Sequence, residues 1–442
     1  MRKDYKDLFV CIGCQDSYRK NIMPLCDDVI FLKPTDITVD RKAKITSQAD
    51  LCQLTENNID IGTAVLSSIK TDYGDDNPPL ASLLKGVRTR LKAGTQVARL
   101  LGEILDKYYP DKVYMFNGRH FDSRPLLRMC QDRGIDFYTY EVEFSPKKFN
   151  LCHNSTPHSL SNLQGQFINY LKLQHAQLNT SSIINRINSK EDIYAQGFRA
   201  SQKAKALPAD FNIDIHNISI LHSSEDEYAN VDDSLRLWGH ESFANLLASL
   251  SHKYISNKEI LFYVRLHPRL QKYNPQSVKD LLRLNYKNVH VIPPDSSIDT
   301  FALACASQCT LCYGSTAGPE AILLGARAVC IGECAYSGVG MMPEAKNFEI
   351  LDKYITNPEL INCSKEVAAQ YINFLSKKGE IFLIEKEVYS FTRGGLNQFL
   401  QQFYNLCLKC RIPTRKGFIS LLLYTYWRVQ IYLKGFLQNI MQ

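Results

Sequence analysis

The chain has 442 residues, of which 45% are hydrophobic and 22% are charged, so disorder is excluded and two domains are expected. The net charge is +7, and the seven positive charges that follow Glu387 account for all of it, because no Asp or Glu comes after that residue. The rest of the chain is close to neutral and carries no nucleic-acid reader motif, which argues against a nucleic-acid partner. No apolar run is long enough for a transmembrane helix or a signal-peptide core.

The first half predicts a β-α-β unit. The predicted elements are strands at 8–14, 28–32, 113–116 and 135–140 and helices at 83–108 and 124–133. The helix between the last two strands implies that these strands pair in parallel. Asn117, Arg119 and Glu141 follow these strands, so we expect them to face the same cleft as the strand-end residues of the second half, with Glu141 as a candidate general base. An ion pair between Arg119 and Glu141 is the structural alternative.

The second half alternates strands and helices. Strands are predicted at 218–221, 260–266, 289–292, 310–313 and 328–331, with helices between them such as 238–250 and 317–324. Five such strands predict a doubly wound parallel sheet, in which ligands bind beyond the carboxyl ends of the strands. No Walker motif, Gly-x-Gly-x-x-Gly turn or Gly-x-Ser-x-Gly elbow is present.

Polar residues gather at these strand ends. Ser223 and Ser224 follow the first strand, and Arg265 and His267 end the second, where Pro268 holds the imidazole in place to donate to a phosphoryl oxygen. Acidic residues Asp226 and Glu227 come directly after the two serines and are candidate general bases. The alternatives are a loop histidine among solvated arginines and a solvated helix start.

The loop after the fourth strand carries the clearest anion-binding pattern. Gly314 allows a tight turn, and Ser315 and Thr316 place two hydroxyls at a helix N-terminus, where an anion is favoured. Glu320 lies one turn further on and is expected to accept from a ribose hydroxyl. The alternative is a helix cap with a carboxylate that complements the helix dipole. No Asp-x-Asp pair follows a strand, so we expect no metal and no other cofactor.

Fourteen cysteines include three pairs with Cys-x-x-Cys spacing, at Cys11/Cys14, Cys309/Cys312 and Cys407/Cys410. Residues three apart in a strand point to opposite faces, so we expect reduced structural cysteines rather than zinc sites. Many unpaired cysteines without a signal peptide favour a cytoplasmic location.

Several strings resemble the capsule polysaccharide biosynthesis glycosyltransferases, distant relatives of the transferases of Kdo and other CMP-linked sugars. They are the segments 222–227, 265–268, 291–294 and 313–321, together with 116–119 followed by Arg124 and Pro125. The resemblance implies an α/β protein of the GT-B type with two Rossmann-like domains and a C-terminal helical tail. It implies an N-terminal acceptor domain at 1–200, a linker at 201–216, a nucleotide-sugar domain at 217–390 and a basic tail at 391–442.

By the same resemblance the protein is a metal-independent glycosyltransferase. The donor is a CMP- or UDP-sugar, and its phosphates contact His267, Ser315 and Thr316. The acceptor is a surface saccharide or its lipid-linked precursor. The alternatives are a sugar-nucleotide epimerase, a polyol-phosphate transferase and a non-catalytic assembly or export factor.

The tail predicts an amphipathic helix. Residues 415–442 mix aromatic and aliphatic positions with Lys416, Arg428 and Lys434. Such a helix is expected to contact an anionic membrane surface, which places the protein peripherally on the inner face of the cytoplasmic membrane. The alternative is a terminal helix packed on the domain.

Overall fold

The computed structural model describes residues 44–142, 148–173, 178–189, 199–223, 236–240, 242–257, 259–273 and 275–381. The strands predicted at 8–14 and 28–32 and the helical tail lie outside these residues. So do the candidate residues Ser224, Asp226 and Glu227.

Helices precede the first described strand. They are α2 (Gln48–Cys52), α3 (Ile61–Tyr73) and α4 (Leu80–Tyr108). The 29-residue helix α4 ends at Tyr109, which adopts a left-handed conformation just before Pro110. Its buried positions Val87 and Leu91 pack with Val65 and Leu66 of α3 in one apolar cluster. The helical spacing of apolar residues therefore predicted α4 correctly, with its start three residues too late.

The first-half sheet contains the predicted β-α-β unit. Strands β1 (Lys112–Phe116) and β2 (Asp136–Val142) pair in parallel on either side of α5 (Arg124–Arg133) in the chain. Strand β3 (Lys148–His153) adds to β2 in the antiparallel direction, so the order is β1-β2-β3-β11. We did not predict β3, whose exposed and buried positions alternate as in a half-covered strand.

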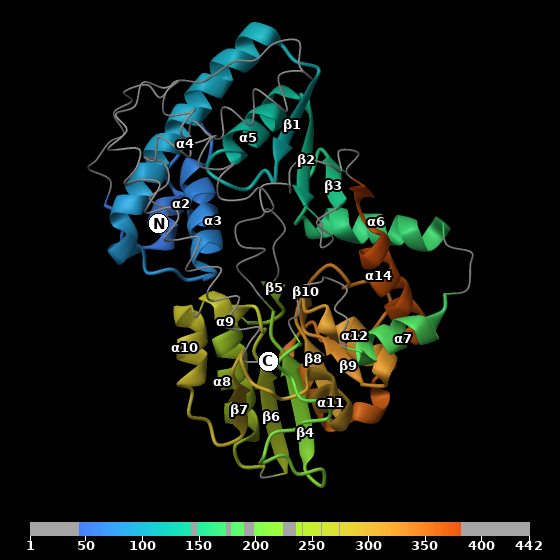
Figure 1. The fold of residues 1–442 in the computed structure, drawn as a ribbon. Coiled ribbons are helices and arrows are strands. Elements are labelled where there is room, and N and C mark those ends of the chain that lie inside the picture. Colours follow the sequence, from blue (N-terminus) through green and yellow to red (C-terminus); the bar gives the residue numbers. More distant parts are fainter. Residues whose placement is uncertain are drawn as a thin grey trace, which may run out of the picture. The chain divides into compact units, whose positions relative to one another are not determined.

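The second-half sheet is fully parallel (Figure 1). Its strands are β4 (His216–Leu221), β6 (Ile260–Arg265), β7 (Val289–Ile292), β8 (Cys309–Cys312) and β9 (Ala328–Cys330). Their spatial order is β7-β6-β4-β8-β9, which is the 3-2-1-4-5 order of a Rossmann half. The α/β class expected from the sequence is confirmed, and the second half has the strand order of a Rossmann-like domain.

Helices cover both faces of this sheet. Helices α8 (Phe243–Tyr254), α10 (Gln276–Leu282) and α13 (Phe348–Thr356) share one apolar cluster, and α11 (Thr300–Ala306) and α12 (Ala317–Leu324) share another. Cys309 belongs to the first cluster and Cys312 to the second, so the pair faces opposite sides of the sheet as predicted. The start of α8 was predicted four to five residues too early, because Gly239 turns the chain with a φ of +76° and Ser242 caps the helix.

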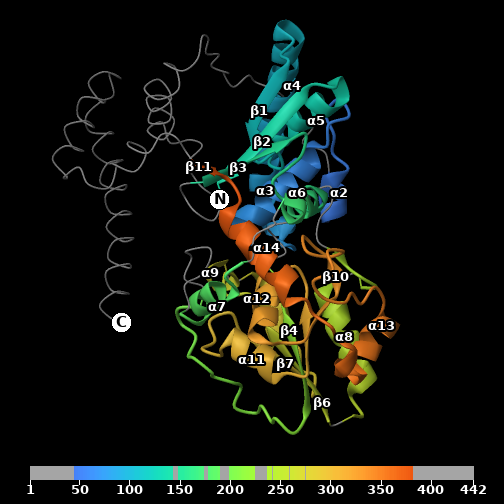
Figure 2. The ribbon, with the colours of Figure 1, turned by 90° about the vertical axis from the view of Figure 1, so that its right-hand side faces the viewer.

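The chain returns to the first-half sheet at its described end. Helix α14 (Lys365–Lys377) contacts α6 (Leu160–Leu173) and α7 (Thr180–Asn188), and β11 (Glu380–Ile381) pairs with β3 (Figure 2). Phe167 of α6 and Ile187 of α7 are buried in the same apolar cluster as α12 and α14. The remaining short elements are β5 (Arg236–Leu237), α9 (Leu270–Tyr273), β10 (Gly332–Glu333) and the 3-10 helix η4 (Pro358–Leu360).

Candidate functional site

The end of β4 delivers a buried histidine. His222 is 7% exposed, its backbone N–H donates to the Arg265 carbonyl at 3.1 Å, and its ring meets Phe243 edge-on. Burial and the neighbouring His267 lower the pKa of His222 to about 3, so the imidazole is neutral at neutral pH. Its Nδ1 atom is buried without a hydrogen-bond partner among the described residues. Ser223 beside it is also buried.

Arg265 at the end of β6 is buried and holds the neighbouring loop. Its guanidinium donates to the carbonyls of Pro293 and Ser296 and lies 3.4 Å from the Thr300 hydroxyl. Burial lowers the pKa of Arg265 to about 10, so it stays charged at neutral pH. Its hydrogen bonds go to neutral oxygens, and the charge of Asp295 offsets part of the effect of burial on its pKa.

His267 has a defined tautomer. The backbone N–H of Arg269 donates to its Nδ1 at 3.2 Å, so in the neutral ring the proton sits on Nε2. Burial, followed by Arg269 and Arg265, lowers the pKa of His267 to about 4. At neutral pH the residue is therefore an uncharged donor through Nε2.

The loop from β8 to α12 is built tightly. Gly314 has a φ of +66°, and a Cβ on Gly318 would lie 2.8 Å from the Cys312 sulfur. The Ser315 carbonyl accepts from the Gly318 N–H at 3.1 Å and from the Tyr336 hydroxyl at 3.0 Å, and its Oγ lies 3.4 Å from the Ala317 N–H. These contacts fix the hydroxyl of Ser315 at the start of α12.

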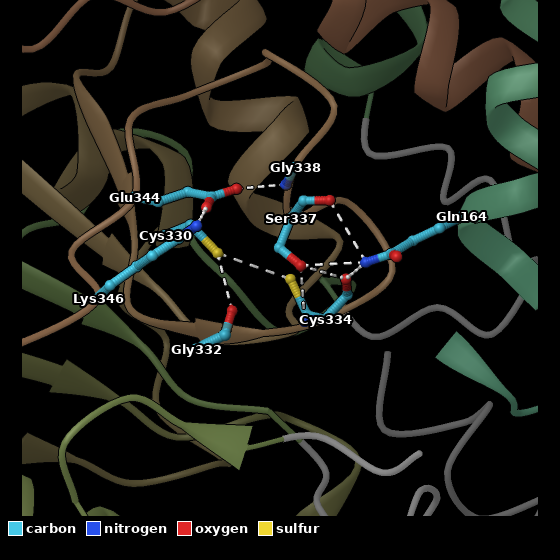
Figure 3. A network of polar contacts seen from close by, with 8 residues as sticks. All are labelled: Gln164, Cys330, Gly332, Cys334, Ser337, Gly338, Glu344 and Lys346. Carbon is cyan, nitrogen blue, oxygen red and sulfur yellow. Dashed lines mark hydrogen bonds and ion pairs between the residues drawn. The ribbon is translucent and has the colours of Figure 1, made fainter. Parts of the chain in front are cut away.

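Tyr336 belongs to a loop at 332–338 that several hydrogen bonds hold in place. Figure 3 shows the contacts that Gln164, Cys334 and Ser337 make there. The side-chain amide of Gln164 from α6 donates to the carbonyls of Cys334 and Ser337 and to the Ser337 hydroxyl. The sulfurs of Cys330 and Cys334 lie 3.7 Å apart, and the Cys330 thiol donates to the Gly332 carbonyl. Since the Tyr336 hydroxyl donates to the Ser315 carbonyl, this loop holds the residue before α12 in position.

Most of the predicted donor-binding residues converge on one cavity of about 70 Å³. Of the predicted residues, Arg265, His267, Ser315, Thr316 and Glu320 line it, and His222 lies among them. Gly314 and Ser223 lie next in sequence to lining residues without lining the cavity themselves. The five predicted residues that line the cavity come from the ends of β6 and β8, and His222 adds the end of β4.

The sequence analysis did not single out four lining residues, which are Arg199, Gln202, Thr300 and Phe301. Arg199 donates to the Ile187 carbonyl at 2.8 Å and stacks its guanidinium 4.7 Å from the centre of the Phe301 ring. Gln202 accepts from the Thr300 N–H at 3.0 Å. All four line the cavity, and Arg199 adds a second guanidinium to it. The last described element before Arg199 and Gln202 is the helix α7 and not a strand, so strand-end reasoning could not find them.

The first-half candidates form a separate group. Asn117 is 1% exposed with a φ of +57°, and its side-chain amide donates to Glu141. Glu141 lies 4.0 Å from His158 Nε2, and burial followed by Arg119 holds the pKa of His158 well below its usual range. Asn117, Arg119 and Glu141 are not among the described residues that line the 70 Å³ cavity.

Neither a metal cluster nor a membrane-crossing helix is found in the part of the chain that the structure describes. No three His, Cys, Asp or Glu side chains gather there in a way that could hold an ion. Within the same residues, no helix has the length and apolarity to span a bilayer.

No family model matches the chain, and no curated protein sequence matches it. Two solved structures from Thermosulfurimonas dismutans are similar in fold. The KpsC β-Kdo 2,4-transferase is 14% identical over 59% of this chain and 87% of its own, with a TM-score of 0.32. The KpsC β-Kdo 2,7-transferase is 11% identical over 62% and 78%, with a TM-score of 0.33.

A UDP-GlcNAc 2-epimerase from Neisseria meningitidis, bound to UDP-GlcNAc, is also similar in fold. It is 13% identical over 67% of this chain and 87% of its own, with a TM-score of 0.27. Identities and TM-scores this low assign no activity to the present chain, so its function rests on its own residues.

Proposed function

We propose that this protein is a glycosyltransferase that moves a sugar from a nucleotide-sugar donor to a surface polysaccharide or its lipid-linked precursor. One observation carries the proposal: two guanidinium groups, a neutral histidine donor and the start of α12 line a single cavity. The cavity lies at the carboxyl ends of parallel strands, where doubly wound sheets bind their ligands. These groups suit the phosphate of a CMP-sugar or the diphosphate of a UDP-sugar.

Each group has a distinct task in this proposal. The Nε2–H of His267 donates to a phosphoryl oxygen, and the hydroxyls of Ser315 and Thr316 donate at the N-terminus of α12. Arg265 and Arg199 offset the negative charge that develops on the departing nucleotide. Fixed donors of this kind stabilise the leaving group without a metal ion.

The transfer step needs a base for the acceptor. The acceptor oxygen forms a bond to the anomeric carbon, the bond from that carbon to the phosphate oxygen breaks, and the acceptor proton passes to a carboxylate. Asp226 and Glu227 follow the cavity residue His222 within five positions of the sequence, and Glu141 lies near the end of β2. All three are candidate bases. Asn117 and Arg119 are proposed to contact the acceptor.

Turnover with and without an acceptor tests the assignment. We expect the full chain to release free nucleotide from a UDP- or CMP-sugar only when a saccharide acceptor is present. Conversion of the sugar itself without acceptor would contradict the transferase and identify an epimerase. Transfer of a polyol phosphate would point to a polyol-phosphate transferase, and nucleotide binding without any turnover would indicate an assembly factor.

The tail is proposed to bring the enzyme to its acceptor. Residues 415–442 carry the apolar and basic positions of an interfacial helix, which suits an anionic inner membrane surface. We expect deletion of 415–442 to abolish sedimentation with vesicles that contain phosphatidylglycerol. Neutral phosphatidylcholine vesicles are the control. Sedimentation that survives the deletion would contradict this role.

A further inference from the structure

A second cavity of about 280 Å³ lies on the other side of His222. His222 lines both cavities, so the two cavities adjoin at this buried residue. The volume is close to the lower end of the roughly 300–1,000 Å³ range of ligand pockets. It suits a ligand of monosaccharide size rather than a whole nucleotide.

The walls of this cavity come from both halves of the chain and are held together by specific contacts. Gly74 and Asp76, which follow α3, form one side. The Asp75 carboxylate, 4% exposed, accepts from the backbone N–H of Gln276 at the start of α10, at 2.9 Å. A Cβ on Gly74 would lie 2.3 Å from the Tyr273 ring, so the two segments are in close contact. These contacts between the two segments hold the walls of the cavity in place.

Its lining combines an apolar floor with a polar rim. Phe243, Leu270 and Leu281 are at most 7% exposed and form the floor. The rim includes the carboxylates of Asp76 and Asp280 and the hydroxyls of Ser242 and Ser277, and its described residues include no Lys or Arg. Arg283 pairs with Asp280 at 3.5 Å and lies outside the lining.

The two cavities therefore differ in charge. The smaller one contains Arg199 and Arg265 with one carboxylate, that of Glu320, whereas the larger one contains two carboxylates and no Lys or Arg among its described lining residues. An acidic sugar would bring its carboxylate beside Asp76 or Asp280 with no cation in the lining to pair with, which is unfavourable. Carboxylates that accept from hydroxyls, and an aromatic floor, favour a neutral polyhydroxylated ring.

We propose that the larger cavity binds an uncharged sugar ring, with the phosphates of the donor held on the far side of His222. The inference rests on the proposed function, because a sugar ring next to a diphosphate site is what a sugar transferase requires. The ring belongs either to the donor or to the acceptor, and the chemistry of the cavity is the same for both.

Matched sugar pairs test the charge preference. Saturation-transfer difference NMR on the full chain would compare glucose with glucuronate and galactose with galacturonate, since each pair differs only at C6. We expect transfer to at least one neutral hexose and a several-fold weaker signal for its acid. Equal or stronger transfer to the acids, or no transfer to either hexose, would overturn the proposal.

Cavity-filling variants locate the signal. Ser277→Trp places an indole in the cavity, and Ser256→Trp places one on an exposed turn after α8 as the control. We expect the hexose signal to disappear in the first variant and to persist in the second. A signal that persists in Ser277→Trp would overturn the proposal, provided that both variants unfold at the wild-type temperature.

If Ser277→Trp fails to fold, Asp280→Asn replaces it, with Asp214→Asn as the control. We expect Asp280→Asn to weaken the hexose signal, and an unchanged hexose signal would overturn the proposal.

Nucleotide titrations identify the source of the ring. If the donor supplies it, Ser277→Trp weakens binding of UDP-glucose and leaves binding of UDP unchanged. If the acceptor supplies it, neither nucleotide is affected while the hexose signal is still lost. Failure of the proposed nucleotide site can be told apart from failure of the sugar cavity. If the nucleotide site is wrong, the wild-type chain itself binds neither UDP nor CMP.

Discussion

At the scale of single residues, backbone neighbours fix the direction of two polar side chains in the smaller cavity, His267 and Arg265. The Arg269 N–H sets the tautomer of His267, and the carbonyls of Pro293 and Ser296 hold Arg265. The sequence predicted the strand-end residues because their positions follow from strand periodicity. It did not predict Arg199 and Gln202, since they reach the cavity from an irregular segment whose path depends on tertiary packing.

The Tyr336 hydroxyl is predicted to support Ser315. Tyr336→Phe removes its bond to the Ser315 carbonyl, which we expect to lower the free energy of unfolding by about 0.5–1.5 kcal/mol. Nucleotide affinity should fall as well, because the start of α12 loses its brace. Urea unfolding and calorimetric titration would measure the two effects. Tyr108→Phe, which alters an exposed ring, is the control, and equal behaviour of both variants would contradict this role.

At the scale of elements, long periodic segments were predictable and short edge strands were not. Helix α5 was predicted with its observed bounds, and all five parallel strands were found within two residues. Strand β11 has two residues and pairs with β3, which lies more than 200 positions earlier in the chain. Nothing local in the sequence reveals such a pairing, because it depends on how the chain returns after α14.

Close packing of α12 on β8 gives a prediction for this element pair. Gly318→Ala would push a methyl group against the Cys312 sulfur, so we expect a loss of about 1–3 kcal/mol in the free energy of unfolding. The double variant with Cys312→Ala should recover part of it. Gly165→Ala in α6 meets nothing within 4 Å and should stabilise by roughly 0.5–1 kcal/mol. Denaturant unfolding of the three variants measures this. A Gly318→Ala variant with the same free energy of unfolding as the wild type would contradict the close contact between Gly318 and the Cys312 sulfur.

At the scale of the whole molecule, buried neutral histidines link stability to pH. Burial lowers the pKa of His222 to about 3 and that of His120 and His267 to about 4. The unfolded chain, in which histidine titrates near pH 6.5, binds more protons than the folded chain between about pH 4 and 6.5. The stabilisation is present above pH 6.5 and is lost as the pH falls toward 4.

We therefore expect the free energy of unfolding to be flat above about pH 7 and to fall on acidification between pH 6.5 and 4. Urea unfolding at a series of pH values measures the slope. His222→Gln should reduce that slope, whereas His252→Gln, which alters an exposed side chain of α8, should leave it unchanged. Stability that rises on acidification in this window would contradict the assignment of neutral histidines.

The most direct test of the central claim is a thermal-shift titration with CMP, UDP and GDP and their common sugar conjugates. A nucleotide that binds the folded chain must raise its melting temperature. We predict that one nucleotide class raises it and that the rise largely disappears in His267→Ala, because the Nε2–H donor to the phosphate is lost. His252→Ala serves as the matched control. No shift with any nucleotide, or a shift that His267→Ala leaves intact, would contradict a nucleotide-phosphate site at the ends of β4, β6 and β8.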